Sequence, residues 1–406
     1  MLTLNNFEAA GDALRGIISG TPLIYSAAFS RAAGNRVYLK PENMQVTGSF
    51  KIRGAYYKIS TLSDEEKTRG LVTASAGNHA QGVAYAAQKA GVSATIVMPV
   101  NTPLVKVNNT RGYGANVILH EGNFDDSADA AAKIADEQGL TYVHPFDDLT
   151  VVTGQGTISY EIFRDMPDVG VILVPIGGGG LAAGVATLAK LLNRKVKVYG
   201  VEPAGAACMK ASIEAGHVVT LPEVDTIADG VAVKRPGDLV FPYLQRNLDG
   251  VITIDDRELV DVFLDLMEKH KMIVENAGML SVAALKHIKE KGQKVVSILS
   301  GGNMDVITVS SLVQQGLLER GRIFSFLIRL PDEPGALMKV AKIIADEKGN
   351  IVQLDHNQFK SIHRQSAVEL RVTLETLGHD HKKAILDAFR DAGYEPTIVA
   401  APDERT

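Results

Sequence analysis

GVILVPIGGGGLAAGVATLAKLL, residues 170–192, carries a single charge, at Lys190, and is long enough to cross a bilayer as one helix. Pro175 and four consecutive glycines would break such a helix. A buried strand over residues 171–176, a glycine turn and a helix from Leu181 account for every residue instead. We therefore predict a strand, a turn and a helix of an α/β protein, and no membrane span.

Strand-like runs of the same kind recur along the chain: GLVTAS, SATIVMPV, ANVILH, TYVHPF, KVKVYGVEP and KVVSILS. Helix-like segments such as NHAQGVAYAAQKAG and DDSADAAAKIADEQG lie between most of them. This alternation predicts an α/β fold with mainly parallel strands. The apolar runs fit sheets that are covered by helices on both faces.

Length and composition limit the functional classes. At 406 residues the chain predicts two or three compact units. Its net charge of -5 offers no basic surface for a phosphate backbone, so nucleic acid is not an expected partner. The one cysteine, Cys208, cannot form an internal disulfide, and the start MLTLNNFEAAGD has neither a basic leader nor a long apolar core. We expect a cytoplasmic protein that acts on small molecules.

The pattern changes after Gly321. RIFSFLIRL, a PDEPG turn, helix ALMKVAKIIADEKG, strands NIVQLDHN and AVELRVTLET, helix HDHKKAILDAFRDAG and strand PTIVA follow in turn. This β-α-β-β-α-β order is typical of a ferredoxin-like α+β domain. Pro334 is expected at the first position of the first helix and Gly349 just after its end. The predicted domains are residues 1–321, with a smaller subdomain nested at about 48–150, and residues 322–406.

The glycines after VILVPI predict a phosphate site. At a helix N-terminus they let backbone N–H groups approach an anion that the helix dipole favours. Two alternatives stay open, a tight turn without ligand and a dinucleotide site. Gly177, Gly179 and Ala182 match G-x-G-x-x-A, and Glu202 lies 20 residues further on. That fingerprint usually opens a domain, however, and here it follows a long α/β segment.

Three other polar, glycine-containing segments are expected at the ends of strands or the starts of helices. They are TASAGNHAQG from Thr73, TGQGT at 153–157, which is expected to open a helix, and SGGN at 300–303. Each alone could be a helix N-cap. Ligands of open α/β sheets bind outside the carboxyl ends of the strands, so the segments together predict one shared crevice.

In their order along the chain these segments resemble the fold-type II pyridoxal-phosphate enzymes and, within them, the serine/threonine dehydratases. The resemblance rests on PENMQVTGSFKIRGA, SAGNHAQGVA, GGGGL, TIADGVAV, VENAG and SGGN, and covers about Thr21 to Asn303. It implies a tryptophan synthase β-like fold with two open, mainly parallel sheets and a pyridoxal 5'-phosphate cofactor. The implied reaction converts L-threonine into 2-oxobutanoate and ammonia, with L-serine as a secondary substrate.

The resemblance also implies roles for single residues. Lys51, in GSFK, would hold the cofactor as a Schiff base and later act as the base; by residue type alone it would be a solvated lysine early in a helix. The implied cofactor contacts are the Phe50 ring, the Asn78 side chain at the 3-hydroxyl, the Ser300 hydroxyl at the pyridine nitrogen, and the amides of Gly177, Gly178, Gly179, Gly180 and Leu181 at the phosphate. Ser75 and the backbone of Ala76, Gly77, Asn78 and His79 would receive the substrate carboxylate.

A hydroxyl at the ring nitrogen, unlike a carboxylate, does not keep that nitrogen protonated, which makes the cofactor a milder electron sink suited to β-elimination. Two departures from related serine racemases sharpen the prediction. Ala76 stands where they carry the serine that donates a proton on the second face, which favours dehydration over racemisation. Those enzymes bind a divalent cation through a glutamate and an aspartate. Glu202 matches the glutamate, but Cys208 stands at the position of the aspartate; because a hard cation prefers oxygen ligands, we expect no metal here.

The C-terminal segment LPDEPGALMKVAKIIADEKGNIVQLDH resembles an ACT domain. This implies edge-to-edge pairing, hence a homodimer or homotetramer, and an amino-acid effector such as isoleucine or valine. A docking or dimerisation domain without a ligand stays open. For the whole chain the alternatives are a serine racemase, another pyridoxal-phosphate enzyme of β-elimination or replacement, and a non-catalytic amino-acid sensor. The sequence does not decide between isoleucine biosynthesis and threonine catabolism.

Overall fold

The computed structural model describes residues 1–357 and 368–399, and the chain divides into two units, Met1–Val306 and Ile307–Thr406. The division falls after the first residue of helix α14 (Val306–Glu319), whereas the predicted domain boundary at Gly321 falls beyond the end of this helix. The predicted domain limits therefore stay a prediction. In the described parts of the chain, no helix combines the length and the hydropathy of a membrane span.

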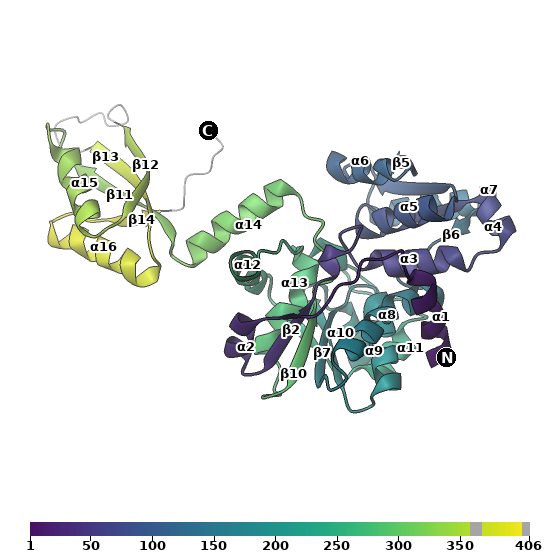
Figure 1. The fold of residues 1–406 in the computed structure, drawn as a ribbon. Helices are drawn as coiled ribbons and strands as arrows, with labels where there is room; N and C mark the ends of the chain where they lie inside the picture. Colours follow the sequence, from purple (N-terminus) through teal and green to yellow (C-terminus); the bar gives the residue numbers. More distant parts are fainter. Residues whose placement is uncertain (358–367, 400–406) are drawn as a thin grey trace. The chain divides into compact units, whose positions relative to one another are not determined.

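The larger sheet of the first unit has the strand order β1-β2-β10-β7-β8-β9 (Figure 1). Its strands are β1 (Ile24–Tyr25), β2 (Arg36–Lys40), β10 (Lys294–Ile298), β7 (Val171–Pro175), β8 (Lys197–Pro203) and β9 (Gly250–Ile254). Strand β1 pairs antiparallel with β2, and the other pairs are parallel. The mainly parallel α/β sheet predicted from the apolar runs is thus confirmed.

A smaller sheet of the first unit, ordered β5-β4-β3-β6, is wholly parallel. It consists of β5 (Asn116–His120), β4 (Ala94–Pro99), β3 (Leu71–Ala74) and β6 (Thr141–Tyr142). Leu71 and Ile96 share a buried cluster with α3 (Lys51–Ser60) and α5 (Asn78–Ala90), whereas Val72 and Val97 pack with α7 (Phe124–Gln138). Alternating side chains of each strand therefore bury opposite faces, as strand geometry requires.

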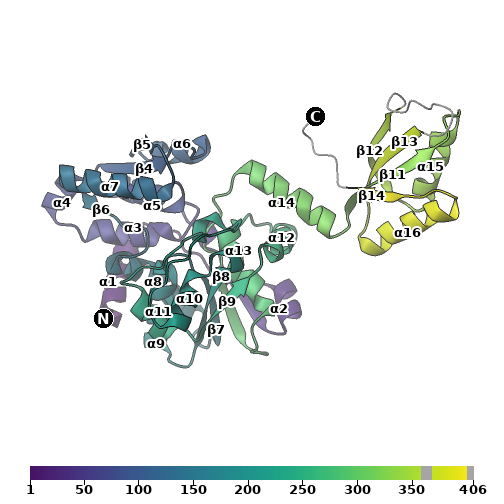
Figure 2. The same cartoon turned by 180° about the vertical axis from the view of Figure 1, so that it is seen from behind.

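The remaining helices of the first unit surround these sheets (Figure 2). They are α1 (Leu4–Leu14), α2 (Ala27–Ala33), α4 (Asp64–Arg69), α6 (Leu104–Gly112), α8 (Leu149–Asp165), α9 (Gly180–Leu192), α10 (Cys208–Ala215), α11 (Phe241–Asn247), α12 (Asp256–Asp265) and α13 (Asn276–Ala283). Short helical turns are η1 (Glu42–Met44), η2 (Ala204–Ala206), η3 (Asp229–Val231), η4 (Leu266–His270) and η5 (Ala284–Lys286).

Two expectations about local structure were wrong in this unit. TYVHPF forms a strand only over Thr141–Tyr142, and its remainder is a loop. TGQGT does not open a helix but lies inside α8, whose N-cap is Asp148. A Cβ at Gly154 would lie 2.5 Å from Arg53 O of α3, and one at Gly156 would lie 2.7 Å from Gly184 O of α9. These glycines therefore serve close helix packing and not a helix start.

The second unit has the order β11 (Ile323–Leu330), α15 (Ala336–Asp346), β12 (Asn350–Asn357), β13 (Val368–Glu375), α16 (His379–Asp391) and β14 (Thr397–Val399). Its antiparallel sheet, ordered β12-β13-β11-β14, confirms the predicted ferredoxin-like arrangement. Pro334 and Gly349 do not occupy the positions expected for them at the ends of α15. Pro334 lies two residues before the first helical residue, Ala336, and Gly349 lies two residues after the C-cap, Glu347. Gly335 is the N-cap of α15 at φ +91°, and Lys348 takes the left-handed conformation at φ +62°.

Candidate active site

The GSFK and SGGN segments lie side by side in the first unit. The Phe50 N–H donates to Ser300 O at 3.0 Å, and Ser49 forms an isolated antiparallel bridge with Gly301. Lys51 is the first residue of α3, and Ser300 is buried just beyond the end of β10. The structure thus brings together Phe50, Lys51 and Ser300, three of the residues predicted for the site.

The amine of Lys51 points at a backbone carbonyl. Its Nζ donates to Pro145 O at 2.7 Å and lies 5.3 Å from the centre of the Phe50 ring. Burial lowers the pKa of Lys51 to about 8, against an opposing effect of the negative charge of Glu275. Near neutral pH, part of such a lysine population is therefore unprotonated. A lysine that acts as a nucleophile or a base must be in this free-amine form.

Asn78 lies between two residues of other segments. As the first residue of α5 it donates from Nδ2 to Glu275 Oε1 at 2.7 Å, and its Oδ1 accepts from Asn303 Nδ2 at 2.8 Å. Glu275, the N-cap of α13, is 7% exposed. Burial, and then the charge of Asp229, raise the pKa of Glu275 to about 8. The asparagine predicted to meet the cofactor is therefore held at both ends of its amide.

The glycine loop between β7 and α9 is lined closely by other segments. A Cβ at Gly178 would lie 2.4 Å from the Phe146 ring, and one at Gly177 would lie 3.0 Å from Val231 Cα. Gly179 has φ +106°, a left-handed conformation that favours glycine. The first amides of α9, including those of Gly180 and Leu181, have no partner within their helix. Backbone donors at a helix N-terminus suit a phosphate group.

The segment Ser75–His79 follows β3 and leads into α5. Gly77 N donates to Ser75 Oγ at 3.2 Å, which turns this loop back on itself; Ala76 and Gly77 are half-buried. His79 Nε2 hydrogen-bonds Val143 O at 2.9 Å. Burial, and then the charge of Lys51, lower the pKa of His79 to about 3, so its ring is neutral. The His79 ring thus holds the neighbouring loop, while the implied substrate contact uses only its backbone.

Residues 143–148, VHPFDD, connect the lysine to the glycine loop. Pro145 O accepts from Lys51, and Phe146 contacts Gly178. The Asp147 carboxylate accepts N–H groups of residues 238–240, and Gly237 N donates to Gly178 O at 3.0 Å. Sequence reasoning missed this loop because it extended the strand through it; the proline after His144 was the available signal for a turn. Glu275 and Asn303 were quoted within motifs but given no role.

Glu202 does not face this site. Its buried carboxylate accepts the N–H groups of Met209 and Lys210 at 2.8 and 2.9 Å and so caps the N-terminus of α10. Burial raises the pKa of Glu202 to about 7. Both oxygens are thus used by the protein, which speaks against the ribose contact of a dinucleotide site. The expectation that no metal binds here stays a prediction.

The lysine at a helix start and the glycine loop at the end of β7 agree with one family. The family profile of pyridoxal-phosphate dependent enzymes matches residues 14–301. The chain belongs to this family. Pyridoxal phosphate is therefore its cofactor, and the residues fit it: an amine of lowered pKa can meet the aldehyde, and the glycine loop supplies backbone donors at the start of α9 for the phosphate.

Individual relatives of this pyridoxal-phosphate enzyme narrow the comparison. An L-threonine ammonia-lyase of Thermotoga maritima is 43% identical over 400 residues, which cover 98% of this chain and 100% of the relative. The processed threonine deaminase isoform 2 of Solanum lycopersicum matches with a TM-score of 0.73 at 38% identity, over 77% of this chain and 94% of its own. Maize serine racemase matches with a TM-score of 0.73 at 34% identity, over 78% and 98%.

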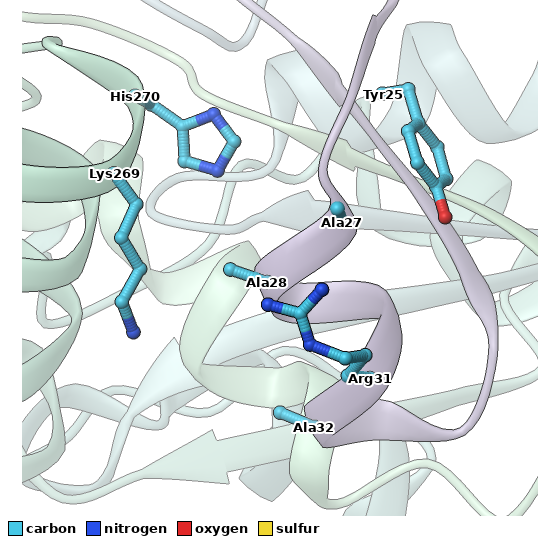
Figure 3. A pocket seen from close by; sticks show the side chains of 7 residues that line it. All are labelled: Tyr25, Ala27, Ala28, Arg31, Ala32, Lys269 and His270. Carbon is cyan, nitrogen blue, oxygen red and sulfur yellow. The ribbon is translucent and has the colours of Figure 1, made fainter.

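An open cavity of about 780 Å³ lies elsewhere in the first unit (Figure 3). It is lined by Tyr25, Ala27, Ala28, Arg31, Ala32, Lys269 and His270. His270 is already engaged, because its Nε2 hydrogen-bonds Ser26 Oγ at 2.8 Å and its ring stacks on Phe29. None of the residues predicted for the cofactor lines this cavity, so we assign the chemistry to the surroundings of Lys51.

The attachment of pyridoxal phosphate to the protein freed of cofactor should depend on pH through Lys51. Only the unprotonated amine attacks the aldehyde, and the pKa of Lys51 is lowered from 10.5 to about 8. The initial rate, followed by the visible absorbance of the lysine-bound cofactor, should rise about tenfold per unit below pH 8 and level off above it. A rate that still rises about tenfold per unit at pH 9 would show an ordinary lysine.

Proposed function

We propose that this chain is an L-threonine ammonia-lyase, a carbon–nitrogen lyase that yields 2-oxobutanoate and ammonia and takes L-serine as a secondary substrate. The observation that carries the proposal is the Lys51 amine, held by Pro145 O with a pKa lowered to about 8. The preceding residue, Phe50, is hydrogen-bonded to Ser300, and Phe146, next to Pro145, packs on the glycine loop. The threonine-acting relative from Thermotoga maritima, similar over nearly the whole chain, supports the choice of substrate.

The residues of this chain divide the work as follows. The amides of Gly177–Leu181 would bind the cofactor phosphate, and Asn78 and Ser300 would hold its ring. Ser75 and the backbone of residues 76–79 bind the substrate carboxylate. The bound cofactor supplies an electron sink for the negative charge that develops at the substrate Cα. Lys51 Nζ would take the Cα proton, and the β-hydroxyl would leave as water with a proton donated from near the cofactor phosphate.

Ala76 separates this reaction from racemisation. Racemisation needs a second acid on the face opposite Lys51, and the methyl group of Ala76 has no proton to give. The dehydrated product instead takes up water and loses ammonia, so that the sum is one threonine converted to one 2-oxobutanoate and one ammonia. A serine racemase is the second candidate, because the maize enzyme of that name shares the fold.

A steady-state assay separates these candidates. With pyridoxal phosphate present, we expect 2-oxobutanoate from L-threonine at a higher kcat/KM than pyruvate from L-serine, and no measurable D-serine. Formation of D-serine at a rate comparable to that of pyruvate would favour the racemase. A protein that binds amino acids but shows neither turnover nor a visible cofactor band would be the sensor, and would contradict our proposal.

We propose further that the second unit is a regulatory domain that binds isoleucine or valine and takes part in forming a homodimer or homotetramer. Its ferredoxin-like strand order and the PDEPG turn before α15 support this assignment. Strands β12 and β14 lie at the edges of its sheet among the described strands, where a second copy can add its own strand.

Removal of the second unit should abolish regulation but not turnover. The end of α14 is tied to that unit, because Thr376 Oγ1 donates to Gly321 O at 2.5 Å and His379 Nε2 hydrogen-bonds Glu319 O at 2.9 Å. A chain ending at Val306 therefore cuts more cleanly than one ending at Gly321. An effector response is typically a coupling of about 1–3 kcal/mol, and it should vanish in threonine saturation curves of the shortened chain.

The full-length protein with isoleucine or valine added is the control for this truncation. A response to isoleucine that survives in the shortened chain would place the effector site in the first unit. Precipitation of the shortened chain without cofactor would show that the first unit does not fold alone, against the expectation from its own buried clusters.

A further inference from the structure

Two asparagines and a glutamate form a continuous hydrogen-bonded chain beside Lys51. Asn303 Nδ2 donates both to Thr47 O at 2.7 Å and to Asn78 Oδ1 at 2.8 Å, and Asn78 Nδ2 donates to Glu275 Oε1 at 2.7 Å. We call Asn303, Asn78 and Glu275 the amide chain. It joins the segments SAGNH, VENAG and SGGN, and its hydrogen bond to Thr47 O reaches the residue just before GSFK.

The two ends of the amide chain decide how the Asn78 amide is turned. Thr47 O is a backbone carbonyl and can only accept, so the nitrogen of Asn303 must face it. The second N–H of that nitrogen then meets an acceptor, which is the oxygen of Asn78. The nitrogen of Asn78 consequently faces Glu275, whose Oε1 accepts whether the carboxyl group is ionised or carries its proton on the other oxygen. One Asn78 N–H is left over, and it is the donor available to the cofactor.

Two glycines leave room for the amide chain. A Cβ at Gly48 would lie 2.2 Å from Asn303 Oδ1, and Gly48 has φ +70°. A Cβ at Gly301 would lie 2.1 Å from Glu275 Oε1. A side chain at Gly48 would displace Asn303, and a side chain at Gly301 would displace Glu275. Gly48 and Gly301 are therefore required by the packing of the amide chain.

Charged groups from three other elements act on Glu275. Asp229 of η3 disfavours its negative charge, whereas Lys106 of α6 and Lys51 of α3 favour it. Lys106 also pairs with Asp229 at 3.5 Å. The carboxyl group is nevertheless fixed by geometry, since it is packed against Gly301 and bonded to Asn78.

We propose that Glu275 and Asn303 are positioning residues of the active site, which hold the Asn78 amide in the one orientation that presents an N–H to the cofactor ring. The expected effect on threonine turnover rests on the proposed function. The hydrogen bonds of the amide chain can be tested separately, by thermal unfolding of the variants. If the Asn78 amide were rotated by half a turn, its oxygen and not its N–H would face the 3-hydroxyl oxygen of the cofactor. Two acceptor oxygens that face each other repel.

The test uses the cofactor-loaded, full-length protein with Glu275→Leu, Glu275→Gln, Asn303→Asp and the double variant Asn303→Asp/Glu275→Gln. Glu275→Leu removes the acceptor; we expect kcat for threonine to fall about 10- to 100-fold with a small change in KM. Glu275→Gln keeps an acceptor oxygen and should stay within about threefold of the parent. The visible circular dichroism of the bound cofactor, which reports ring orientation, should weaken in Glu275→Leu only.

Asn303→Asp replaces the donor by an acceptor and should turn Asn78; at pH 9, above the pKa of about 8 of Glu275, the turned oxygen then opposes a carboxylate. We expect a lower thermal midpoint and a low kcat. Adding Glu275→Gln supplies a donor to the turned oxygen, so the midpoint should rise again while kcat and the circular dichroism stay low. This separation of stability from turnover distinguishes orientation from packing.

Glu290→Gln and Glu290→Leu are the matched controls. Glu290 also accepts one side-chain hydrogen bond of 2.7 Å, from Tyr199, but it precedes β10, at the end of the strand opposite Ser300. Both should leave kcat and the cofactor signal unchanged.

Unchanged kcat and circular dichroism in Glu275→Leu and Asn303→Asp, in an active parent, would overturn the inference and leave the proposed function intact. If the parent itself binds no cofactor and turns over no threonine, the proposed function fails. The amide chain is then judged by the thermal midpoints: additive effects of Asn303→Asp and Glu275→Gln would overturn it.

Discussion

Lys51→Ala should abolish threonine turnover, with a fall in kcat of about 10⁴-fold or more. The variant loses the amine that attaches the cofactor and the base that takes the Cα proton, so two steps fail at once. Its fold should persist, because alanine is the best helix former and Lys51 is the first residue of α3. The visible band of the lysine-bound cofactor should be absent as well.

Lys58→Ala is the control for this change. Lys58 lies on the same helix and pairs with Asp148 at 2.7 Å, but it has no contact with the residues predicted for the cofactor among its described interactions. We expect its kcat to stay within about fivefold of the parent, the range of a partly exposed ion pair. Turnover of Lys51→Ala within tenfold of the parent would refute the assignment of the site.

Arg53→Met should give the largest loss of stability. The guanidinium is fully buried, donates twice to Glu42 at 2.8 Å and once to Glu161 at 2.7 Å, and also contacts Thr157. The substitution would leave two carboxylates facing one cation, the buried Lys40 that contacts Glu161. Loss of one partner of a buried ion pair costs about 3–5 kcal/mol in the free energy of unfolding.

Urea unfolding of the cofactor-loaded protein measures this loss. Burial by itself would raise the pKa of Glu161, but Arg53 and Lys40 hold it at about 2, so the carboxylate is charged and depends on them at neutral pH. Arg164→Met is the control, since that side chain is 70% exposed beside Asp165 and should change stability by less than about 1 kcal/mol. An equal unfolding midpoint for Arg53→Met and the parent would show that the buried pair contributes nothing.

The buried charges also connect stability to the site. Arg53 stands two residues after Lys51 and fastens the first turn of α3 to Glu42 and Glu161 of other elements. In Arg53→Met we therefore expect a weaker hold on the cofactor before the protein unfolds, seen as loss of the visible band at lower urea than the loss of helical signal. Nothing in the sequence around Arg53 indicated that it would be buried.

Features that depend on neighbours in the chain were determined by the sequence itself. The apolar runs predicted the parallel strands, the glycines after Pro175 predicted the turn into α9, and the order of elements after Gly321 predicted the ferredoxin-like unit. These features follow from side-chain periodicity and turn chemistry, which act over a few residues. The motif around Lys51 could be found in the sequence for the same reason, because it consists of consecutive residues.

Only the tertiary structure decided what the site residues touch. Lys51 Nζ and Pro145 O lie 94 residues apart in the chain, and Asn78 and Glu275 lie 197 apart. No local sequence pattern predicts which residues will be such partners. They come together only when helices and strands pack through their apolar faces, which places the polar residues at the ends of these elements next to one another. The burial that sets the pKa of Lys51 has the same origin: the sequence supplies the amine, and the packing around it supplies the low-dielectric surroundings that release its proton.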